Sequence, residues 1–128
     1  MNAEPHDIDA PDLAATIGAL TPDQLNALPF GAIRLDAAAD VLFYSDVERQ
    51  QSGYRKEVLG RAFFLEIAPC FGQSQYKRRI EQALTGGKLD ITFDHTADLP
   101  NGAQDVDLHV RVVSATDGGC WILTRIDD

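Results

Sequence analysis

The chain has 128 residues, 45% of them hydrophobic and 24% charged, and its formal net charge at pH 7 is −9. This length suits a single domain with a real hydrophobic core and is too short for two. The acidic balance argues against nucleic acids and anionic membranes as partners, because both need basic patches on the protein. No apolar run approaches the roughly 20 residues of a membrane span, and the start lacks a signal peptide, so we expect a soluble cytoplasmic protein.

The first part of the chain predicts a small helical cap. Apolar side chains recur at helical spacing at Leu13, Ile17 and Leu20. A second helix start comes next, with the hydroxyl of Thr21 as cap, Pro22 in the first turn and Gln24 three residues after the cap. Two such short helices cannot form a core alone and must dock on the rest of the domain. We expect residues 1–28 to form this cap and residues 29–128 to form the core of a single domain.

The remaining segments predict an α+β fold. Five runs have the composition or alternation of strands: residues 30–35, 41–44, 89–95, 106–112 and 120–126. Short helical segments are expected between the second and third strands, at residues 45–51, 54–59 and 62–67, followed by a longer helix from Ser74 to Leu84 that ends at Gly86-Gly87. This is the order of a PAS fold, a five-stranded antiparallel sheet. We expect the central helices on one face of the sheet and the N-terminal cap on the other.

Three residues suggest a covalent-ligand pocket. Cys70 follows a rigid Ala-Pro step outside any periodic run. Tyr44 and Glu48 are four residues apart and would share one helical face. A thiol can hold a ligand while a phenol and an acid bind its far end. Taken singly, these residues also fit an inert buried cysteine, a strand-end aromatic residue and a solvated helix acid.

Four stretches, taken together, resemble the photoactive yellow protein family, blue-light receptors of the PAS fold. The resemblance runs from about Asp12 to Ile126. Its strongest pieces are Leu28-Pro29-Phe30-Gly31-Ala32-Ile33-x-Leu35-Asp36, Tyr44-x-x-x-Glu48, Phe63-Phe64-x-x-Ile67-Ala68-Pro69-Cys70 and the closing Cys120-Trp121. A likeness to the fold alone would imply little about function, because PAS domains host many functions. The Ala-Pro-Cys step combined with Tyr-x-x-x-Glu is far more selective.

The resemblance implies a chromophore, p-coumaric acid (4-hydroxycinnamic acid), bound as a thioester to Cys70. It also implies that Tyr44 and Glu48 hydrogen-bond the phenolate, with Ser52 at the position of the family's supporting threonine. The other pocket positions that match the family are Phe63, Ile67, Ala68 and Pro69. Pro69 fixes its own backbone φ and favours an extended Ala68, which sets where the sulfur points.

The same resemblance implies a mechanism. Burial next to an anion raises the pKa of a carboxyl, so Glu48 is expected to be protonated in the dark. Light would isomerise the chromophore from trans to cis, and Glu48 would give its proton to the phenolate. The carboxylate left behind would be buried without a partner, which destabilises the fold. The N-terminal cap would loosen first and expose a surface to a downstream signalling protein.

Some positions depart from the family pattern. The loop after Ser52 is one residue shorter, and the shielding arginine of the family has no clean match near Tyr54 or Arg55. Ala97 and Leu99 stand where the family has aromatic residues, and the family's loop methionine falls near Pro100 or Asn101. These departures leave open a PAS module that binds a non-covalent ligand or a protein partner.

An enzymatic role has little support in the sequence. A Cys70 nucleophile would need a histidine near it, and none stands beside it in sequence. No Ser-His-Asp or paired-carboxylate pattern stands out, and His95 and His109 lack a recognisable third metal ligand. Cys120, beside Trp121, is expected in the core. We expect a monomer or weak dimer that is not an enzyme and holds no metal.

Overall fold

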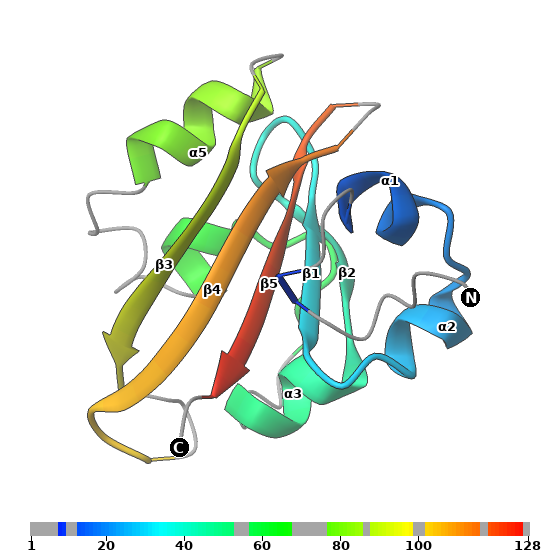
Figure 1. Ribbon diagram of the computed structural model, residues 1–128. Helices are drawn as coiled ribbons and strands as arrows, with labels where there is room; N and C mark the ends of the chain where they lie inside the picture. Colours follow the sequence, from blue (N-terminus) through cyan, green and yellow to red (C-terminus); the bar gives the residue numbers. More distant parts are fainter. Residues whose placement is uncertain are drawn as a thin grey trace.

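The computed structural model describes residues 8–9, 13–52, 57–67, 77–85, 88–98, 102–115 and 118–126. A five-stranded antiparallel sheet forms its centre, in the order β2-β1-β5-β4-β3 (Figure 1). The strands are β1 Gly31–Leu35, β2 Val41–Tyr44, β3 Asp90–Ala97, β4 Val106–Ser114 and β5 Cys120–Ile126. Strand β5 is central and joins the hairpin of β1 and β2 to the β3-β4 pair. The predicted α+β PAS architecture is confirmed.

Helices lie on both sides of the sheet, as predicted (Figure 1). The helices are α1 Leu13–Gly18, α2 Pro22–Asn26, α3 Asp46–Ser52, the π-helical turn η1 Phe63–Ile67, and α5 Lys77–Leu84. Helices α1 and α2 cover one face, and η1 and α5 pack on the other. Within the residues that the structure describes, no helix is long and apolar enough to span a membrane.

Each face of the sheet supports its own apolar core. The core under η1 and α5, which we call the first core, includes Ile33, Leu35, Tyr44, Val58, Phe63, Phe64, Ile80, Leu84, Phe93, Val110, Val112, Cys120 and Ile122. The core under α1 and α2, the second core, includes Ile8, Leu13, Ile17, Leu25, Leu28, Phe30, Ala32, Val113, Trp121 and Leu123. Successive strand residues point to opposite faces, so β5 supplies both cores in turn.

The two N-terminal helices depend on docking. Thr21 Oγ1 accepts a hydrogen bond from the Gln24 backbone N–H at 3.2 Å, and Gln24 Oε1 accepts one from the Thr21 N–H at 2.9 Å. This capping box confirms the predicted helix start. A helix of five residues is not stable alone. Leu25 of this helix and Leu28 just after it are buried in the second core, so packing on the sheet stabilises it.

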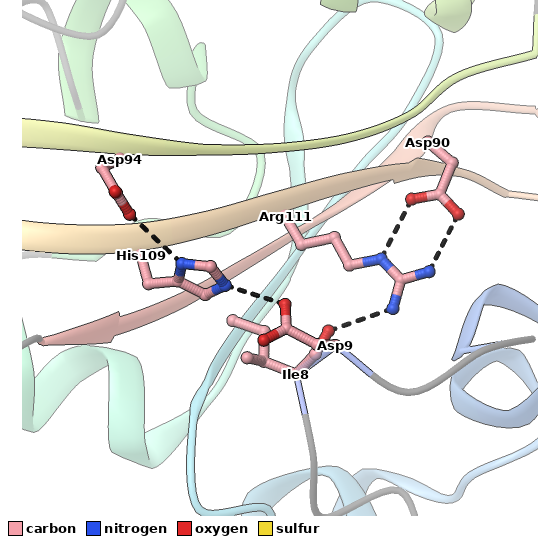
Figure 2. A network of polar contacts seen from close by, with 6 residues as sticks. All are labelled: Ile8, Asp9, Asp90, Asp94, His109 and Arg111. Atoms are coloured by element: carbon pink, nitrogen blue, oxygen red, sulfur yellow. Dashed lines mark hydrogen bonds and ion pairs between the residues drawn. The ribbon is translucent and has the colours of Figure 1, made fainter.

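A network of polar contacts fixes the segment before α1 to the sheet, and we call it the polar clasp (Figure 2). It consists of Ile8, Asp9, Asp90, Asp94, His109 and Arg111. The Arg111 guanidinium donates to both carboxylate oxygens of Asp90, at 3.0 and 2.8 Å, and to the Ile8 carbonyl at 3.1 Å. The His109 ring nitrogens lie 2.8 Å from Asp9 Oδ1 and 3.2 Å from Asp94 Oδ1.

The segment before η1 differs from the sequence prediction. A helical turn was expected over residues 54–59, of which 54–56 lie outside the described residues. Residues 57–59 are not helical, and Gly60 follows with a φ of +79°. The Gly60 N–H donates to the Val41 carbonyl at 2.8 Å, and the Val41 N–H donates to the Arg61 carbonyl at 2.9 Å. The segment therefore takes its backbone hydrogen bonds from β2 and covers that edge of the sheet.

The longer helix agrees with the prediction where it is described. Helix α5 buries Ile80, Ala83 and Leu84 in a sequence that is otherwise polar. This is the amphipathic pattern of a helix with one face on a core. Its expected cap Ser74 and its expected stop Gly86-Gly87 lie outside the described residues.

Candidate functional site

The site begins where β2 ends and α3 starts. Ser45 lies between the two elements and is fully buried. Its Oγ accepts hydrogen bonds from the backbone N–H of Ala32 at 2.9 Å and of Glu48 at 3.2 Å. Ser45 thus caps α3 and fixes its first turn to β1. Ser45 was not predicted as part of the site, although Ser45-Asp46-Val47-Glu48 has the Ser-x-x-Glu spacing of a helix N-terminus.

Tyr44 and Glu48 do not share a helical face, and that prediction is wrong. Tyr44 is the last residue of β2, whereas Glu48 is in the first turn of α3. The chain changes from strand to helix at Ser45, so the spacing of four residues no longer means one face. The Tyr44 ring packs in the first core, and the Arg49 guanidinium carbon lies 5.4 Å from its centroid. A cation over a ring face is attracted by the quadrupole of the ring.

Glu48 is a buried acid. Its relative exposure is 8%, and its Oε1 accepts a hydrogen bond from the Thr124 hydroxyl of β5. Burial raises the pKa of Glu48 from 4.5 to about 7, while the hydrogen bond from Thr124 acts in the opposite direction. A large fraction of this carboxyl is therefore protonated near neutral pH. The prediction that burial raises its pKa agrees with this geometry, and the alternative of a solvated helix acid does not.

Gln51 and Gly31 complete the surroundings of Glu48. Gln51 Nε2 donates to Thr124 Oγ1 at 3.3 Å, and Gln51 Oε1 accepts from the Ile126 backbone N–H at 3.3 Å. A methyl group added to Gly31 would overlap both Glu48 Oε1 and Thr124 Oγ1. Thr124 and Gln51 were not predicted to be neighbours of Glu48. The available signal was one hydroxyl that directly follows four apolar residues in β5.

The remaining candidate residues are described to different extents. Phe63 opens η1, is buried in the first core with Tyr44, and meets Phe64 edge-on with ring centroids 5.2 Å apart. Ser52 ends α3 and Ile67 ends η1, but their side chains lie outside the described part of the structure. The residues entirely outside it are Ala68, Pro69 and Cys70, together with Tyr54, Arg55, Leu99, Pro100 and Asn101. Their predicted roles stay predictions.

The described residues include one cysteine, Cys120, and it is buried in the first core as expected. Burial raises the pKa of its thiol to about 12. A thiol must be deprotonated to act as a nucleophile, so the protonated Cys120 is a poor nucleophile at neutral pH. This leaves Cys70 as the candidate for attachment chemistry, since the chain has two cysteines.

The geometry therefore combines a buried acid, whose pKa lies near neutral pH, with an aromatic core that contains a phenol. Such an acid can donate a hydrogen bond to an anion, or release a proton to one, without exposure to bulk water. Tyr44 adds a phenolic donor in the same core.

The chain is similar to proteins of known function over most of its length. It is 30% identical over 115 residues to the photoactive yellow protein of Halochromatium salexigens, covering 89% of this chain and 91% of the relative. It is 29% identical over 103 residues to the photoactive yellow protein of Rhodothalassium salexigens, covering 80% of this chain and 82% of the relative. No protein-family model matches the chain.

Solved structures show the same likeness. The photoactive yellow protein domain of the sensor histidine kinase Ppr from Rhodospirillum centenum matches with a TM-score of 0.77 at 32% identity, covering 88% of this chain and 98% of that domain. The PAS domain of an HTR-like protein from Haloarcula marismortui matches with a TM-score of 0.57 at 16% identity, covering 88% of this chain and 96% of that one. The second likeness shows the fold alone.

Proposed function

Because the chain belongs to the photoactive yellow protein family of photoreceptors, we propose that it senses blue light through p-coumaric acid bound as a thioester to Cys70. The observation that carries this proposal is the burial of the Glu48 carboxyl in the first turn of α3, where it contacts Thr124 of β5. When bound, the p-coumaroyl group supplies the absorption of light and the trans-to-cis isomerisation of a double bond.

Attachment requires a reactive thiol. The Cys70 thiolate displaces the leaving group of an activated p-coumaroyl donor, so that a carbon–sulfur bond forms as the bond to the leaving group breaks. Pro69 and Ala68 restrict the backbone before the cysteine and set the direction of its sulfur. In this proposal Phe63 and Ile67, which match pocket positions of the family, would supply apolar contacts to the ligand.

Tyr44 and Glu48 hold the far end of the ligand. The Tyr44 hydroxyl donates one hydrogen bond to the phenolate, and protonated Glu48 donates a second. In this proposal Ser52, at the position of the family's supporting threonine, would support this end with its hydroxyl. A neighbouring anion raises the pKa of a carboxyl further, so Glu48 keeps its proton in the dark. With the chromophore bound, Glu48 would be the proton donor, and loss of its proton would leave a buried carboxylate, a change worth several kcal/mol.

The N-terminal cap converts this charge into a signal. Helices α1 and α2 are short and are stabilised by their contacts with the second core. They should therefore loosen before the five-stranded sheet does. We propose that a downstream signalling protein binds the freed surface. The receptor is proposed to work in the cytoplasm as a monomer or weak dimer, without nucleic-acid or membrane partners. It is proposed not to be an enzyme.

Attachment is tested by mixing the purified chain with activated p-coumaric acid and measuring intact mass and absorption. The expected result is one adduct per chain and a visible band. Cys70→Ala should abolish both, whereas the matched variant Cys120→Ala should keep them. A coloured Cys70→Ala protein, or a wild-type protein that takes up no adduct, contradicts the proposal.

Signalling is tested by hydrogen exchange in the dark and under blue light. Illumination should accelerate exchange more in residues 13–28 than in residues 106–113 of β4. Unchanged protection of both segments in a bleached sample would refute the role of the cap.

The alternative is a PAS module that binds a non-covalent ligand or a protein partner. It is favoured by Ala97 and Leu99, which replace the family's aromatic residues. The same mass measurement separates the two functions, because a non-covalent ligand leaves the mass of the denatured chain unchanged.

A further inference from the structure

Three polar side chains converge on the bare backbone of Gly31 inside the first-core face of the sheet. A methyl group at this position would overlap Glu48 Oε1, lie 2.6 Å from Thr124 Oγ1 and 3.0 Å from Gln51 Nε2. The three side chains come from α3 and from the central strand β5. Glycine at position 31 therefore provides the room in which they meet.

The hydrogen bonds around Thr124 have a fixed direction. Gln51 Oε1 accepts from the Ile126 backbone N–H, and this orients the amide so that its Nε2 faces Thr124. That Nε2 donates to Thr124 Oγ1 at 3.3 Å. A hydroxyl has one proton to donate, and the Thr124 hydroxyl donates it to Glu48 Oε1. Gln51 thus orients Thr124, and Thr124 acts as a donor toward Glu48.

Packing alone does not explain a threonine at this position. The four preceding residues of β5 are apolar and buried, and Thr124 is itself only 7% exposed. By strand alternation Thr124 points to the same face as Ile122, which belongs to the first core. A buried hydroxyl is unfavourable unless it is hydrogen-bonded. Its bond to Glu48 compensates for that cost.

We propose that Thr124, oriented by Gln51, is a positioning residue that stabilises the ionised form of Glu48. A donor to a carboxylate favours the charged form, and hydrogen bonds to charged groups are stronger than those to neutral ones. Thr124 therefore opposes the effect of burial. In the photochemical role, which rests on the proposed function, Thr124 would hold the Glu48 carboxylate after its proton has left.

The test is a titration of the Glu48 carboxyl by NMR in the full chain without chromophore, using carbon-13-labelled glutamate and assigning the signal with Glu48→Gln. Thr124→Val keeps the shape of the side chain and removes the hydroxyl. It should raise the pKa of Glu48 by about one unit, a tenfold change in the protonation equilibrium. The control Thr124→Ser keeps the hydroxyl, so the pKa of Glu48 in this variant should equal the wild-type value.

Gln51→Leu provides a second variant in case Thr124→Val does not fold. It removes the group that orients Thr124, so the Glu48 pKa should rise, by less than in Thr124→Val. The inference is overturned if the pKa of Glu48 stays the same or falls in both Thr124→Val and Gln51→Leu. It is also overturned if Thr124→Ser changes the pKa of Glu48 as much as Thr124→Val does.

The titration needs no ligand, so a failure of p-coumaric acid to attach to Cys70 would refute the proposed function and leave this result readable. If the chromophore does attach, Thr124→Val should shorten the lifetime of the bleached state. An unchanged lifetime, together with an unchanged Glu48 pKa, would refute the inference while the photoreceptor function stood.

Discussion

Replacing Glu48 with glutamine should remove most of the dependence of folding stability on pH between pH 5 and 8 in the chain without chromophore. The Glu48 carboxyl has its ordinary pKa of 4.5 in the unfolded chain and a pKa of about 7 in the folded one. Between these values the folded state binds more protons than the unfolded state. The free energy of unfolding therefore falls as pH rises through this window and levels off above about pH 7.

The size of the effect follows from the same two values. Each pKa unit between the folded and unfolded states is worth about 1.4 kcal/mol. For a carboxyl that moves from 4.5 to about 7, linkage gives a loss of about 2–3 kcal/mol between pH 5 and pH 8. Glutamine has a similar shape, accepts a hydrogen bond from Thr124 through its amide oxygen, and carries no charge at either pH.

The measurement is urea denaturation of both proteins at several pH values, with the difference between their unfolding free energies plotted against pH. Glu66→Gln is the matched control. Glu66 is exposed, and hydrogen bonds from the Ala62 N–H and from Arg61 lower its pKa, so it is ionised in both states from pH 5 to 8. Its replacement should leave the slope unchanged. A flat difference curve for Glu48→Gln would refute the assignment of Glu48 as a buried acid.

Two further predictions concern the polar clasp and the glycine beside Glu48. The pKa of His109 is raised by its contacts with Asp9 and then Asp94, so its contribution to folding stability is fully present below about pH 6.5 and is lost as pH rises through the pKa of the folded state. The difference in unfolding free energy between wild type and His109→Gln should shrink by up to about 1 kcal/mol from pH 6 to 8.5. A constant difference would contradict the ion pairs. Gly31→Ala should destabilise the fold by about 1–3 kcal/mol, because the added methyl group overfills its site. Gly18→Ala in α1 is the control: its methyl group meets no atom within 4 Å and should not lower the urea midpoint. Equal midpoints for the two variants would refute the packing around Gly31.

The sequence predicted those parts of the fold that depend on local patterns. One such pattern is the alternation of apolar and polar residues in β4. Another is the capping box, whose hydroxyl and amide come from Thr21 and Gln24, three residues apart. The segment around Gly60 was predicted wrongly because its hydrogen bonds go to β2, and nothing in its own sequence specifies that pairing. Local propensity is overridden where a segment can complete the edge of a sheet.

The site was predictable only in part, for a related reason. Tyr44 and Glu48 were identified by spacing and by resemblance, but their geometry depends on the change from strand to helix at Ser45. Apart from Val47, helix α3 is polar, so its sequence gives no sign that Glu48 is buried. The donor to Glu48 is Thr124, 76 residues away. Contacts between such distant residues leave no periodic pattern in the sequence.

Strand β5 links the two faces of the sheet at the level of single residues. Thr124 contacts Glu48 on the first-core face, while the preceding residue, Leu123, is fully buried in the second core with the apolar residues of α1 and α2. Because neighbouring strand residues point to opposite faces, the buried acid and the docking surface of the cap are separated only by the thickness of one strand. The strand that hydrogen-bonds the acid also forms part of the surface on which the cap packs. In the proposed photoreceptor, a change of charge at Glu48 can therefore act on the cap directly through β5.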